Sequence, residues 1–335
     1  MGARKILLGH GSGGRLMHDL IRGLLLNKLN NPVLKDLSDS ALLDIKGPLA
    51  FTTDSFVVSP LFFPGGDIGK LAVCGTVNDL TVSGASPECL SLSLIIEEGF
   101  DYALLEKIVD SISKTAKQAG VKIVTGDLKV VEHQAADKIF INTSGIGRII
   151  KGRKLSVRNI CVGDKVIVSG DIARHGLSVL AKRKGLDLGF AINSDCAALN
   201  GLLVPILKKT DAIKFMRDPT RGGVATTLNE IAESSGFGIR VEEKCLPVSN
   251  KIRAACELLG IDPLYVANEG RVIIIVKKDS AEKVLNLLKK NRLGQGSEVI
   301  GSLTKENKGK VILKTSLGTE RILDMLSSEP LPRIC

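Results

Sequence analysis

The sequence predicts an α/β (or α+β) protein with two domains of similar size. The chain has 335 residues, more than one hydrophobic core usually spans. Strand-like and helix-like segments alternate along both halves, as they do in α/β and α+β folds. Residues 151–162 interrupt this alternation with a basic, irregular stretch. We therefore predict one domain at 1–155, a second at 156–326 and a flexible tail at 327–335.

The first half opens with a predicted strand at Leu49–Ser59, which is rich in β-branched and aromatic residues and ends before Pro60. A helix follows at Asp67–Ser83, with apolar residues near helical spacing, Asp67 as its N-cap and Gly84 as its stop. The other predicted elements of this half are strands at Leu90–Glu97, Val121–Thr125 and Lys138–Arg148 and a helix at Asp101–Ala119.

The second half alternates in the same way and contains no short repeat or low-complexity segment. Its predicted strands are Lys165–Ser169, Gly238–Glu242 and Arg271–Lys277, and its predicted helices are Leu177–Lys184, Val224–Ser234 and Ser280–Lys290. Each half thus has the elements for one layered domain.

The composition argues against several classes of protein. No apolar run approaches the roughly 18–20 residues needed to cross a bilayer, and Met1–Ile6 is too short of apolar residues for a secretory signal. We therefore expect a cytoplasmic protein that does not use a membrane. The net charge is +10, but Lys and Arg are spread among almost as many carboxylates without interleaved aromatic residues. We expect no nucleic-acid partner, and anionic small molecules or an acidic protein partner explain the charge better.

Seven cysteines are scattered along the chain without a C-x-x-C pair, which fits neither a zinc ribbon nor a disulfide framework. Six lie among apolar residues and are expected in the core. The seventh, Cys335, ends a tail in which Pro330 and Pro332 oppose helix formation. This pattern indicates a thiol on a short extended arm, with a frayed C-terminus as the simpler alternative.

Four aspartates of the first half lie beside small residues near the predicted ends of strands or helices: Asp39, Asp54, Asp79 and Asp127. Mg²⁺ prefers oxygen ligands and is usually held by a few carboxylates together with phosphate oxygens. Any one of these aspartates could be a helix cap or a turn residue. Four of them in one half predict a magnesium–polyphosphate site.

Two glycine-rich loops, Gly9–Arg15 and Phe63–Asp67, support this prediction because backbone without a Cβ can approach a phosphate closely. Neither loop is a Walker A motif. The nearest match, Gly65–Lys70, has the wrong gap and lacks a Ser or Thr after the lysine. A nucleotide would therefore bind on another scaffold.

Several strings of the sequence resemble the HypE family of hydrogenase maturation factors, which belongs to the PurM-like (AIR synthase-related) superfamily of ATP-dependent enzymes. The strings are HGSGGRLM (10–17), TTDSFVVSPLFFPGGDIGKLAVCGTVNDL (52–80), LIIEEGF (94–100), TGDLKVV (125–131), RDPTRGG (217–223) and PRIC (332–335). They are spread over essentially the whole chain.

The resemblance implies a two-domain PurM-like fold with ATP and Mg²⁺ between the halves. The sheet of the first domain would pair with its twin in a homodimeric β-barrel, and a second α/β domain would pack beside it. The implied reaction starts when the carbamoyltransferase HypF places a carbamoyl group on Cys335. ATP-dependent dehydration then leaves a protein thiocyanate, whose cyanide passes to iron on the HypC–HypD complex during nickel–iron hydrogenase assembly.

The resemblance also implies roles for particular residues. Cys335 would carry the carbamoyl group, Lys129 would stabilise charge on the transferring phosphoryl group, and Glu269 would remove protons from the carbamoyl nitrogen. The nucleotide would contact Asp54, Asp79, Asp127, Lys129, Gly11, Gly65 and Gly66, and the metal would contact Asp39, Asp54, Asp79 and Asp127. Without the resemblance, Glu269 reads as a turn residue and Lys129 as a solvated lysine at a strand end.

The chain departs from the usual family pattern in two places. Leu128 stands where the family has a threonine, and Ala173-Arg174 stands before His175 where the family usually has Gly-Asp. The first change removes a hydroxyl near the expected phosphates. The second leaves the role of that loop open.

Two other functions remain open at this point. One is a kinase or synthetase for a small metabolite from the same superfamily, of the thiamine-phosphate kinase or AIR synthetase type. The other is a carrier that presents Cys335 to partners without catalysis. The terminal thiol argues against the first, and the set of aspartates argues against the second.

Overall fold

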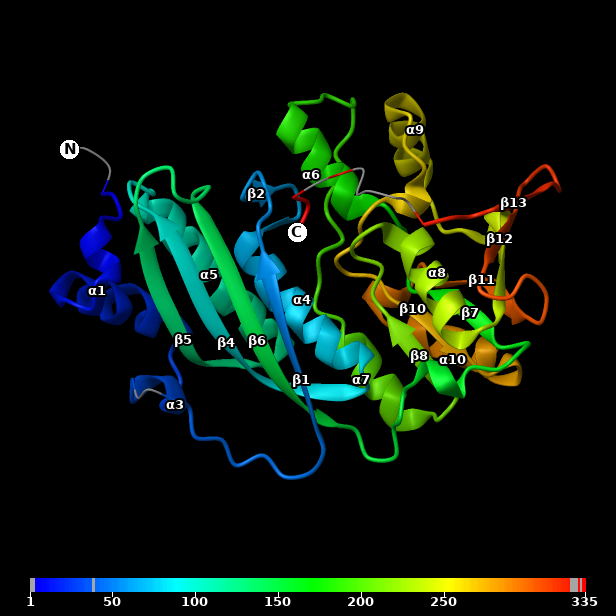
Figure 1. The fold of residues 1–335 in the computed structure, drawn as a ribbon, viewed down its shortest axis with the longest axis horizontal. Coiled ribbons are helices and arrows are strands. Elements are labelled where there is room, and N and C mark those ends of the chain that lie inside the picture. The colour runs from blue at the N-terminus through cyan, green and yellow to red at the C-terminus, as the bar shows by residue number, and fades with distance from the viewer. Residues whose placement is uncertain (1–3, 38–39, 326–330, 332) are drawn as a thin grey trace.

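The computed structural model describes residues 4–37, 40–325, 331 and 333–335. Two large β-sheets organise the chain, one in each half (Figure 1). The last strand of the first sheet ends at Ile149, and the first strand of the second sheet begins at Lys165. The basic, irregular stretch of the sequence therefore connects the two sheets.

The first sheet has four strands in the order β1-β6-β4-β5, so β1 and β5 are its edges. Strands β4 and β5 run parallel, and the other pairs are antiparallel. Two helices cover one face, and the opposite face is turned toward the viewer in Figure 1. These elements are β1 (Leu49–Phe56), β4 (Ala85–Glu97), β5 (Lys122–Val131), β6 (Ile139–Ile149), α4 (Ile68–Val82) and α5 (Tyr102–Ala119).

The side chains of β1 alternate between the two faces of this sheet. Phe56 points to the helices and is 2% exposed, whereas Phe51 points away from them and is 71% exposed. Leu49 and Ile95 are also exposed on that second side. We call this surface, with Leu49, Phe51 and Ile95, the outer sheet face.

Helix α4 is central to the molecule because it lies between the first sheet and the second domain. All but three of its 15 residues, Lys70, Asp79 and Val82, are buried. Its first turn is capped as the sequence predicts, since the Asp67 carboxylate accepts hydrogen bonds from the backbone N–H groups of Gly69 and Lys70. Lys70, near the start of α4, and Asp79, near its end, are the polar side chains of this helix that remain partly exposed.

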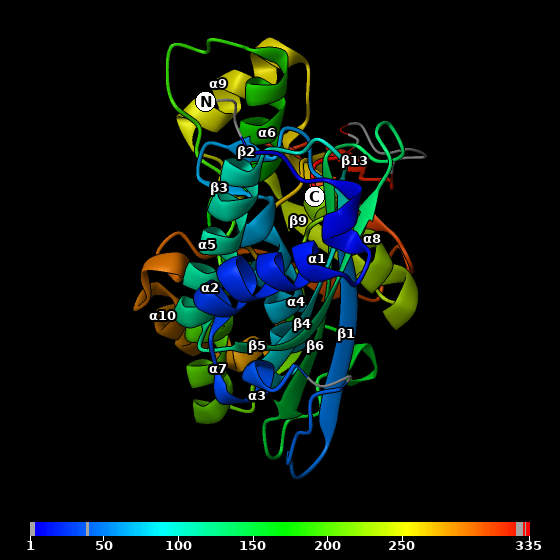
Figure 2. The same ribbon diagram turned by 90° about the vertical axis from the view of Figure 1, so that its left-hand side faces the viewer.

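The N-terminal segment forms short helical pieces along strand β5 and helix α5 (Figure 2). They are η1 (Leu8–Gly11), α1 (Arg15–Leu20), η2 (Ile21–Leu26), α2 (Asn27–Leu29) and α3 (Pro32–Lys35). They are not among the predicted elements, although α1, η2 and α2 follow one another without a break from Arg15 to Leu29.

The second sheet has seven strands in the order β13-β12-β9-β11-β7-β10-β8. Helix α8 packs on one of its faces, and helices α7 and α10 pack on the other. The strands are β7 (Lys165–Val168), β8 (Ile213–Arg217), β9 (Gly238–Glu242), β10 (Ile273–Val276), β11 (Glu298–Thr304), β12 (Val311–Lys314) and β13 (Glu320–Ile322). The helices are α6 (Arg174–Lys184), α7 (Asn200–Lys209), α8 (Gly223–Ser235), α9 (Asn250–Leu259) and α10 (Ala281–Lys289).

Short elements complete the fold. A two-stranded ladder joins β2 (Phe62–Phe63) and β3 (Gly66–Asp67). Single turns of 3-10 helix lie at η3 (Val157–Asn159), η4 (Glu243–Cys245), η5 (Pro263–Tyr265), η6 (Lys278–Ser280) and η7 (Arg292–Gly294).

All predicted helices and strands are present, but several observed elements have no counterpart in the prediction. The elements that the sequence analysis missed in the second half are α7, β8, α9, β11, β12 and β13. Strand β5 is also longer than predicted, because Gly126-Asp127 continues the strand instead of ending it. A Cβ on Gly126 would lie 2.2 Å from the Leu92 carbonyl oxygen. The glycine therefore permits a close approach to β4 rather than a turn.

The cysteines follow the prediction only in part. No disulfide joins the cysteines of the described residues, and Cys74, Cys89, Cys196 and Cys256 are buried. Cys161 is exposed and Cys245 is half-buried, so placing them in the core is wrong. Among the described residues, no helix is both long and apolar enough to span a membrane.

Candidate active site between the two domains

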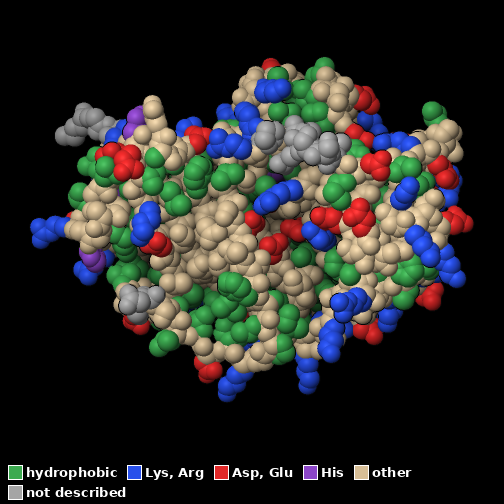
Figure 3. Space-filling model, in the orientation of Figure 1, with side chains coloured by type: hydrophobic (Ala, Val, Ile, Leu, Met, Phe, Trp, Pro, Cys, Tyr) green, Lys and Arg blue, Asp and Glu red, His purple; other side chains and the backbone are tan. Residues whose placement is uncertain are grey.

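A pocket of about 680 Å³ opens between the first sheet and the second domain. Three aspartates from separate elements line it: Asp54 on β1, Asp79 on α4 and Asp218 directly after β8. Figure 3 shows acidic side chains gathered along this junction. We call it the acidic pocket. The structure thus brings together two of the predicted aspartates and adds a third.

Asp54 and Asp79 are positioned by the contact between β1 and α4. Asp54 lies opposite Thr143 in the ladder, and the Thr143 hydroxyl donates to the Ala72 carbonyl of α4. The inward side of β1 therefore rests on the helix. The Thr52 hydroxyl, also on that side, donates to the Asp79 carboxylate at 2.9 Å. Both aspartates lie within their elements rather than at the ends that the sequence predicts.

Burial and mutual repulsion shape the ionisation of this pocket. Burial, and secondarily the Asp79 charge, raise the pKa of Asp54. Burial also raises the pKa of Asp79, against a hydrogen bond from Thr52. The pKa of Asp218 rises to about 7, first because it is buried and then because it faces Asp79. A cation in the pocket would lower all three pKa values.

Two arginines stand beside these carboxylates. The Arg221 guanidinium lies 3.8 Å from an Asp54 oxygen, and Arg217 pairs with Glu230 at 2.9 Å. In the described parts of the chain, no three His, Cys, Asp or Glu side chains converge closely enough to form a metal site by themselves. A metal ion here would need further oxygen ligands from a second molecule.

Asp218 is not among the site residues predicted from the sequence, although it lies within the string RDPTRGG (217–223). A usable signal was present. Asp218 follows a strand and precedes the glycines that open helix α8, which is the placement used to select the other aspartates. It was missed because strand β8 itself was not predicted.

Glu269 is buried, at 3% exposure, between the two domains. Its Oε1 has no hydrogen-bond partner among the described residues. Burial, followed by the charges of Asp218 and Asp195, raises its pKa well above the usual range. Its backbone is held in place because the Asn78 side chain of α4 donates to the Glu269 carbonyl oxygen at 3.3 Å.

Asp127 and Lys129 lie elsewhere. In the sheet they are beside Ser93 and Ile95 of β4, on the outer sheet face, whereas Asp54 is on the covered face. Lys129 forms an exposed ion pair with Asp127 at 3.0 Å, and this pair lowers the pKa of Asp127. The predicted position of Asp127 at a strand end is wrong, because β5 continues to Val131. Asp39 lies outside the described residues.

The three predicted glycines have packing roles in the structure. A Cβ on Gly11 would lie 2.3 Å from the Val130 backbone nitrogen, which places the N-terminal loop against β5. A Cβ on Gly65 would lie 2.7 Å from the Ser194 nitrogen, and one on Gly66 would meet the Phe63 ring. Gly11 is therefore near Lys129, whereas Gly65 and Gly66 are near the contact between the domains.

The described part of the tail is docked between the domains, near the label C in Figure 1. The N–H of Val57 donates to the Cys335 carbonyl at 3.3 Å, and the N–H of Ser59 donates to the Arg333 carbonyl at 3.2 Å. The tail therefore runs antiparallel to the segment that follows β1. Ile334 is 1% exposed, and Arg333 pairs with Asp137 at 2.6 Å.

His175 holds this tail from the second domain. Its Nε2 lies 2.9 Å from the Ile334 carbonyl oxygen, and its Nδ1 lies 2.8 Å from the Ser194 hydroxyl. Burial lowers the pKa of His175, so the ring is neutral and carries one proton. Because a carbonyl only accepts, that proton is on Nε2, and Ser194 donates to Nδ1.

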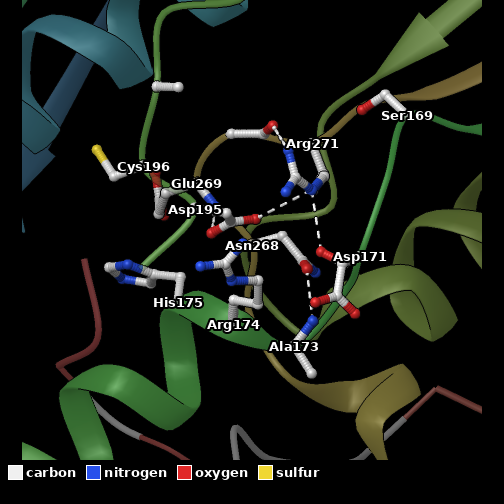
Figure 4. Close-up of polar contacts among 12 residues, drawn as sticks. Ser169, Asp171, Ala173, Arg174, His175, Asp195, Cys196, Asn268, Glu269 and Arg271 are labelled. Atoms are coloured by element: carbon white, nitrogen blue, oxygen red, sulfur yellow. Dashed lines mark hydrogen bonds and ion pairs between the residues drawn. The ribbon is translucent and has the colours of Figure 1, made fainter. Parts of the chain in front are cut away.

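A chain of contacts then runs from the tail to Glu269. Ser194, which bonds to His175, is followed by Asp195, and the Asp195 carboxylate accepts a hydrogen bond from the Glu269 N–H at 3.2 Å (Figure 4). The tail and Glu269 are therefore positioned by one continuous segment of the second domain. This role of His175 is not visible in the sequence, because its partners Ser194 and Ile334 lie 19 and 159 residues away in the chain.

Comparison with known proteins agrees with this architecture. Residues 37–149 match the N-terminal domain of AIR synthase related proteins, and residues 162–314 match the C-terminal domain. The chain is 46% identical over 334 residues to a carbamoyl dehydratase HypE of Rhodobacter capsulatus, covering 99% of this chain and 98% of the relative.

Solved structures give the same result. A hydrogenase maturation protein HypE in complex with ATP matches with a TM-score of 0.95 and 47% identity over 98% of this chain and 99% of its own. A HypE–HypF complex matches with a TM-score of 0.81 and 47% identity over 93% of this chain and 100% of its own. Thiamine monophosphate kinase from Aquifex aeolicus, at 20% identity and a TM-score of 0.60, shares the fold. The chain therefore belongs to the HypE family of the AIR synthase related, or PurM-like, superfamily.

Proposed function

We propose that this chain is an ATP-dependent carbamoyl dehydratase that acts on its own Cys335 during hydrogenase maturation. The docked tail carries this proposal. Val57, whose N–H binds the Cys335 carbonyl, lies three residues after Asp54, about 10 Å along an extended chain. A Cys335 backbone held this close to a carboxylate pocket supports a reaction on the chain itself rather than on a free metabolite.

The proposed reaction converts a thiocarbamate into a thiocyanate. The carbamoyl oxygen attacks the terminal phosphorus of ATP and displaces ADP. The carbamoyl nitrogen then loses both of its protons, and the oxygen departs as phosphate. A carbon–nitrogen triple bond remains. Phosphorylation is needed because oxide or hydroxide is a poor leaving group, whereas phosphate leaves readily.

The acidic pocket fits a magnesium–phosphate group. Partial burial, and secondarily the charge of Asp79, raise the pKa of Asp54 and Asp218, and a bound divalent cation would offset both effects. Mg²⁺ is usually held by a few carboxylates and by phosphate oxygens, which agrees with a carboxylate set that needs ligands from a second molecule. When bound, the ion would stabilise negative charge on the transferring phosphoryl group.

Glu269 is the proposed base. Its raised pKa makes its carboxylate a stronger proton acceptor than an ordinary glutamate. The unpaired Oε1 leaves one oxygen available to a substrate proton. Asn78 and Asp195 fix its backbone from both sides, so the side chain can move a proton without a change in the main chain.

We further propose a homodimer through the outer sheet face, forming the expected β-barrel. Phe51, at 71% exposure, and the open edge strand β1 support it. In such a dimer Lys129, Asp127 and Gly11 of one copy would serve the nucleotide held in the acidic pocket of the other. Asp39 would join the metal ligands, and Gly65 and Gly66 would border the nucleotide.

The proposed partners are HypF, which would load the carbamoyl group, and the HypC–HypD complex, which would receive cyanide. A relative of 47% identity forms a HypE–HypF complex, which supports the first. We place the protein in the cytoplasm, because its reaction needs a reduced thiol at Cys335 and the cytoplasm keeps thiols reduced.

Intact-mass spectrometry tests the proposal. The chain is incubated with a purified carbamoyltransferase HypF, carbamoyl phosphate and ATP. We expect first the mass of one added carbamoyl group and then the loss of one water, both located on Cys335 by peptide mapping. Cys335→Ser should show neither change, with Cys161→Ser as the matched exposed-thiol control. Adducts on another cysteine, or no water loss with ATP present, would refute the proposal.

A further inference from the structure

A second pocket, of about 570 Å³, lies on the other side of helix α4. Lys70 and Cys74 of the helix line it, whereas Asp79 lines the acidic pocket. Lys70 and Asp79 are about two and a half helical turns apart, which places them on opposite sides of the helix. The volume is within the range of sites for small molecules, about 300–1,000 Å³.

Positive side chains from separate segments converge on this second pocket. They are Lys70 on α4, Arg174 at the start of α6, Arg271 just before β10 and Arg292 in η7. Figure 4 shows Arg174 and Arg271 in one group with Asp195. We call this site, defined by these four cations, the basic pocket.

The protein itself neutralises little of this charge. Lys70 Nζ donates to the Gly65 carbonyl at 2.8 Å, and Arg174 Nε donates to the Asn193 carbonyl at 3.1 Å. Carbonyl groups orient these side chains without cancelling their charge. In the described part of the chain, Lys70, Arg174 and Arg292 form no ion pair with a carboxylate.

Asp195 is the one carboxylate among the residues that line the basic pocket. It lies 3.7 Å from Arg271 Nε, and both side chains are almost fully buried. A buried arginine needs such a partner, so the Asp195 charge offsets Arg271. The charges of Lys70, Arg174 and Arg292 remain available to a ligand.

Neutral hydrogen-bonding groups complete the lining. Thr115 and Gln118 come from α5 and Asn291 from the turn before Arg292, whereas the Ser194 hydroxyl in the lining already donates to His175. Arginine forks bind oxyanions through paired N–H groups, and lysine adds a point charge. Hydroxyl and amide groups beside them suit a ligand with several oxygens.

We propose that the basic pocket binds a small phosphate-bearing anion at a site distinct from the acidic pocket. The two sites are separated by α4 and by the segments around Ala197 and Glu269, whose carbonyl groups both accept hydrogen bonds from Asn78. The inference does not depend on the proposed function, because it rests on charge and cavity alone. Inorganic phosphate and a phosphorylated metabolite would present the same chemistry to it.

Calorimetric titration of the full chain with pyrophosphate, without divalent cations, tests this site. We expect saturable binding of one anion per chain, and the double variant Arg174→Ala/Arg292→Ala should weaken it at least tenfold. Both side chains are at least partly exposed, so the variant should fold, and its thermal unfolding is measured to check this. Arg240→Ala removes a cation that pairs with Glu320 on the second sheet and should bind as the unmodified chain does.

Two further titrations test where the anion binds and whether the pocket prefers phosphate. Arg221→Ala, which changes the acidic pocket, should leave pyrophosphate binding unchanged; weakened binding there would place the anion in the acidic pocket and overturn the proposal. Malonate, a dicarboxylate, should bind at least tenfold more weakly than pyrophosphate, and equal binding would overturn the phosphate assignment. An affinity unaffected by Arg174→Ala/Arg292→Ala would overturn the site itself.

Discussion

The two sides of helix α4 carry opposite charge. On one side Asp54, Asp79 and Asp218 share a pocket, and on the other side Lys70, Arg174, Arg271 and Arg292 share another. Asp54 and Asp79 lie within a long strand and a long helix, whereas three of the four cations come from a helix start, a loop or a short 3-10 turn. One buried helix thus keeps two charged sites apart, because its backbone and apolar side chains lie between them.

The strongest test of this separation is Asp218→Asn. We expect ATP-dependent dehydration of the carbamoylated chain to fall more than tenfold, because the variant removes one of the pocket's carboxylates without changing its size. The rate is measured by intact mass after quenching at successive times. Asp211→Asn, an exposed carboxylate of the same domain, is the control. Weakened pyrophosphate binding in Asp218→Asn would show that the two pockets are coupled.

The tail gives a second test, because His175 contacts it beside the basic pocket. If the tail left the cleft, the buried N–H of His175 would lose its hydrogen-bond acceptor, at a cost of about 1–3 kcal/mol. His175→Phe removes that donor, so we expect iodoacetamide to label Cys335 several-fold faster at neutral pH. His133→Phe, a change at an exposed histidine, should not alter the labelling rate. Equal rates in both variants would exclude His175 as the residue that holds the tail.

A third expected effect concerns the pH dependence of stability. The folded chain holds the Asp218 proton with a pKa of about 7, against an ordinary value of 3.8. Between these values the unfolded chain loses the proton and the folded chain keeps it, so the contribution of Asp218 to native stability falls as pH rises from about 4 to about 7 and is constant above. Asp218→Asn removes this loss in the free energy of unfolding, which is on the order of 4 kcal/mol at most.

Thermal unfolding in EDTA measures this effect. The midpoint temperature of unfolding of Asp218→Asn should exceed that of the unmodified chain at pH 8 and should match it at pH 4. Asp211→Asn should unfold at the same midpoint temperature as the unmodified chain at pH 4 and at pH 8. A constant difference between Asp218→Asn and the unmodified chain across this range would contradict the raised pKa.

The sequence predicts the fold better than it predicts the site. Strong local signals, such as the Asp67 cap and the alternating residues of β1, are confirmed because they depend on nearby residues. Strand β8 and the short N-terminal helices were missed because they form through contacts with distant segments. Gly126 was taken as the end of a strand because the sequence does not reveal the close approach of Leu92.

The site shows the same limit. The sequence selects Asp54 and Asp79, which stand in recognisable strings, but it also groups them with Asp127 on the opposite face of the sheet. The period-two alternation of strands separates these faces, and it cannot be applied before the register of β4, β5 and β6 is known. The cations of the basic pocket carry no motif at all, since each lies on a different segment.

The docked tail has a kinetic consequence under the proposed function. A substrate group attached to the enzyme through a short arm meets the site at a fixed local concentration, in the millimolar range for such tethers. Dilution of the protein should therefore not slow the conversion of a carbamoylated chain. Each chain would carry out one conversion and then stop until an acceptor removes the cyanide from Cys335, so the amount of protein, rather than its catalytic rate, would limit the cyanide delivered in one cycle.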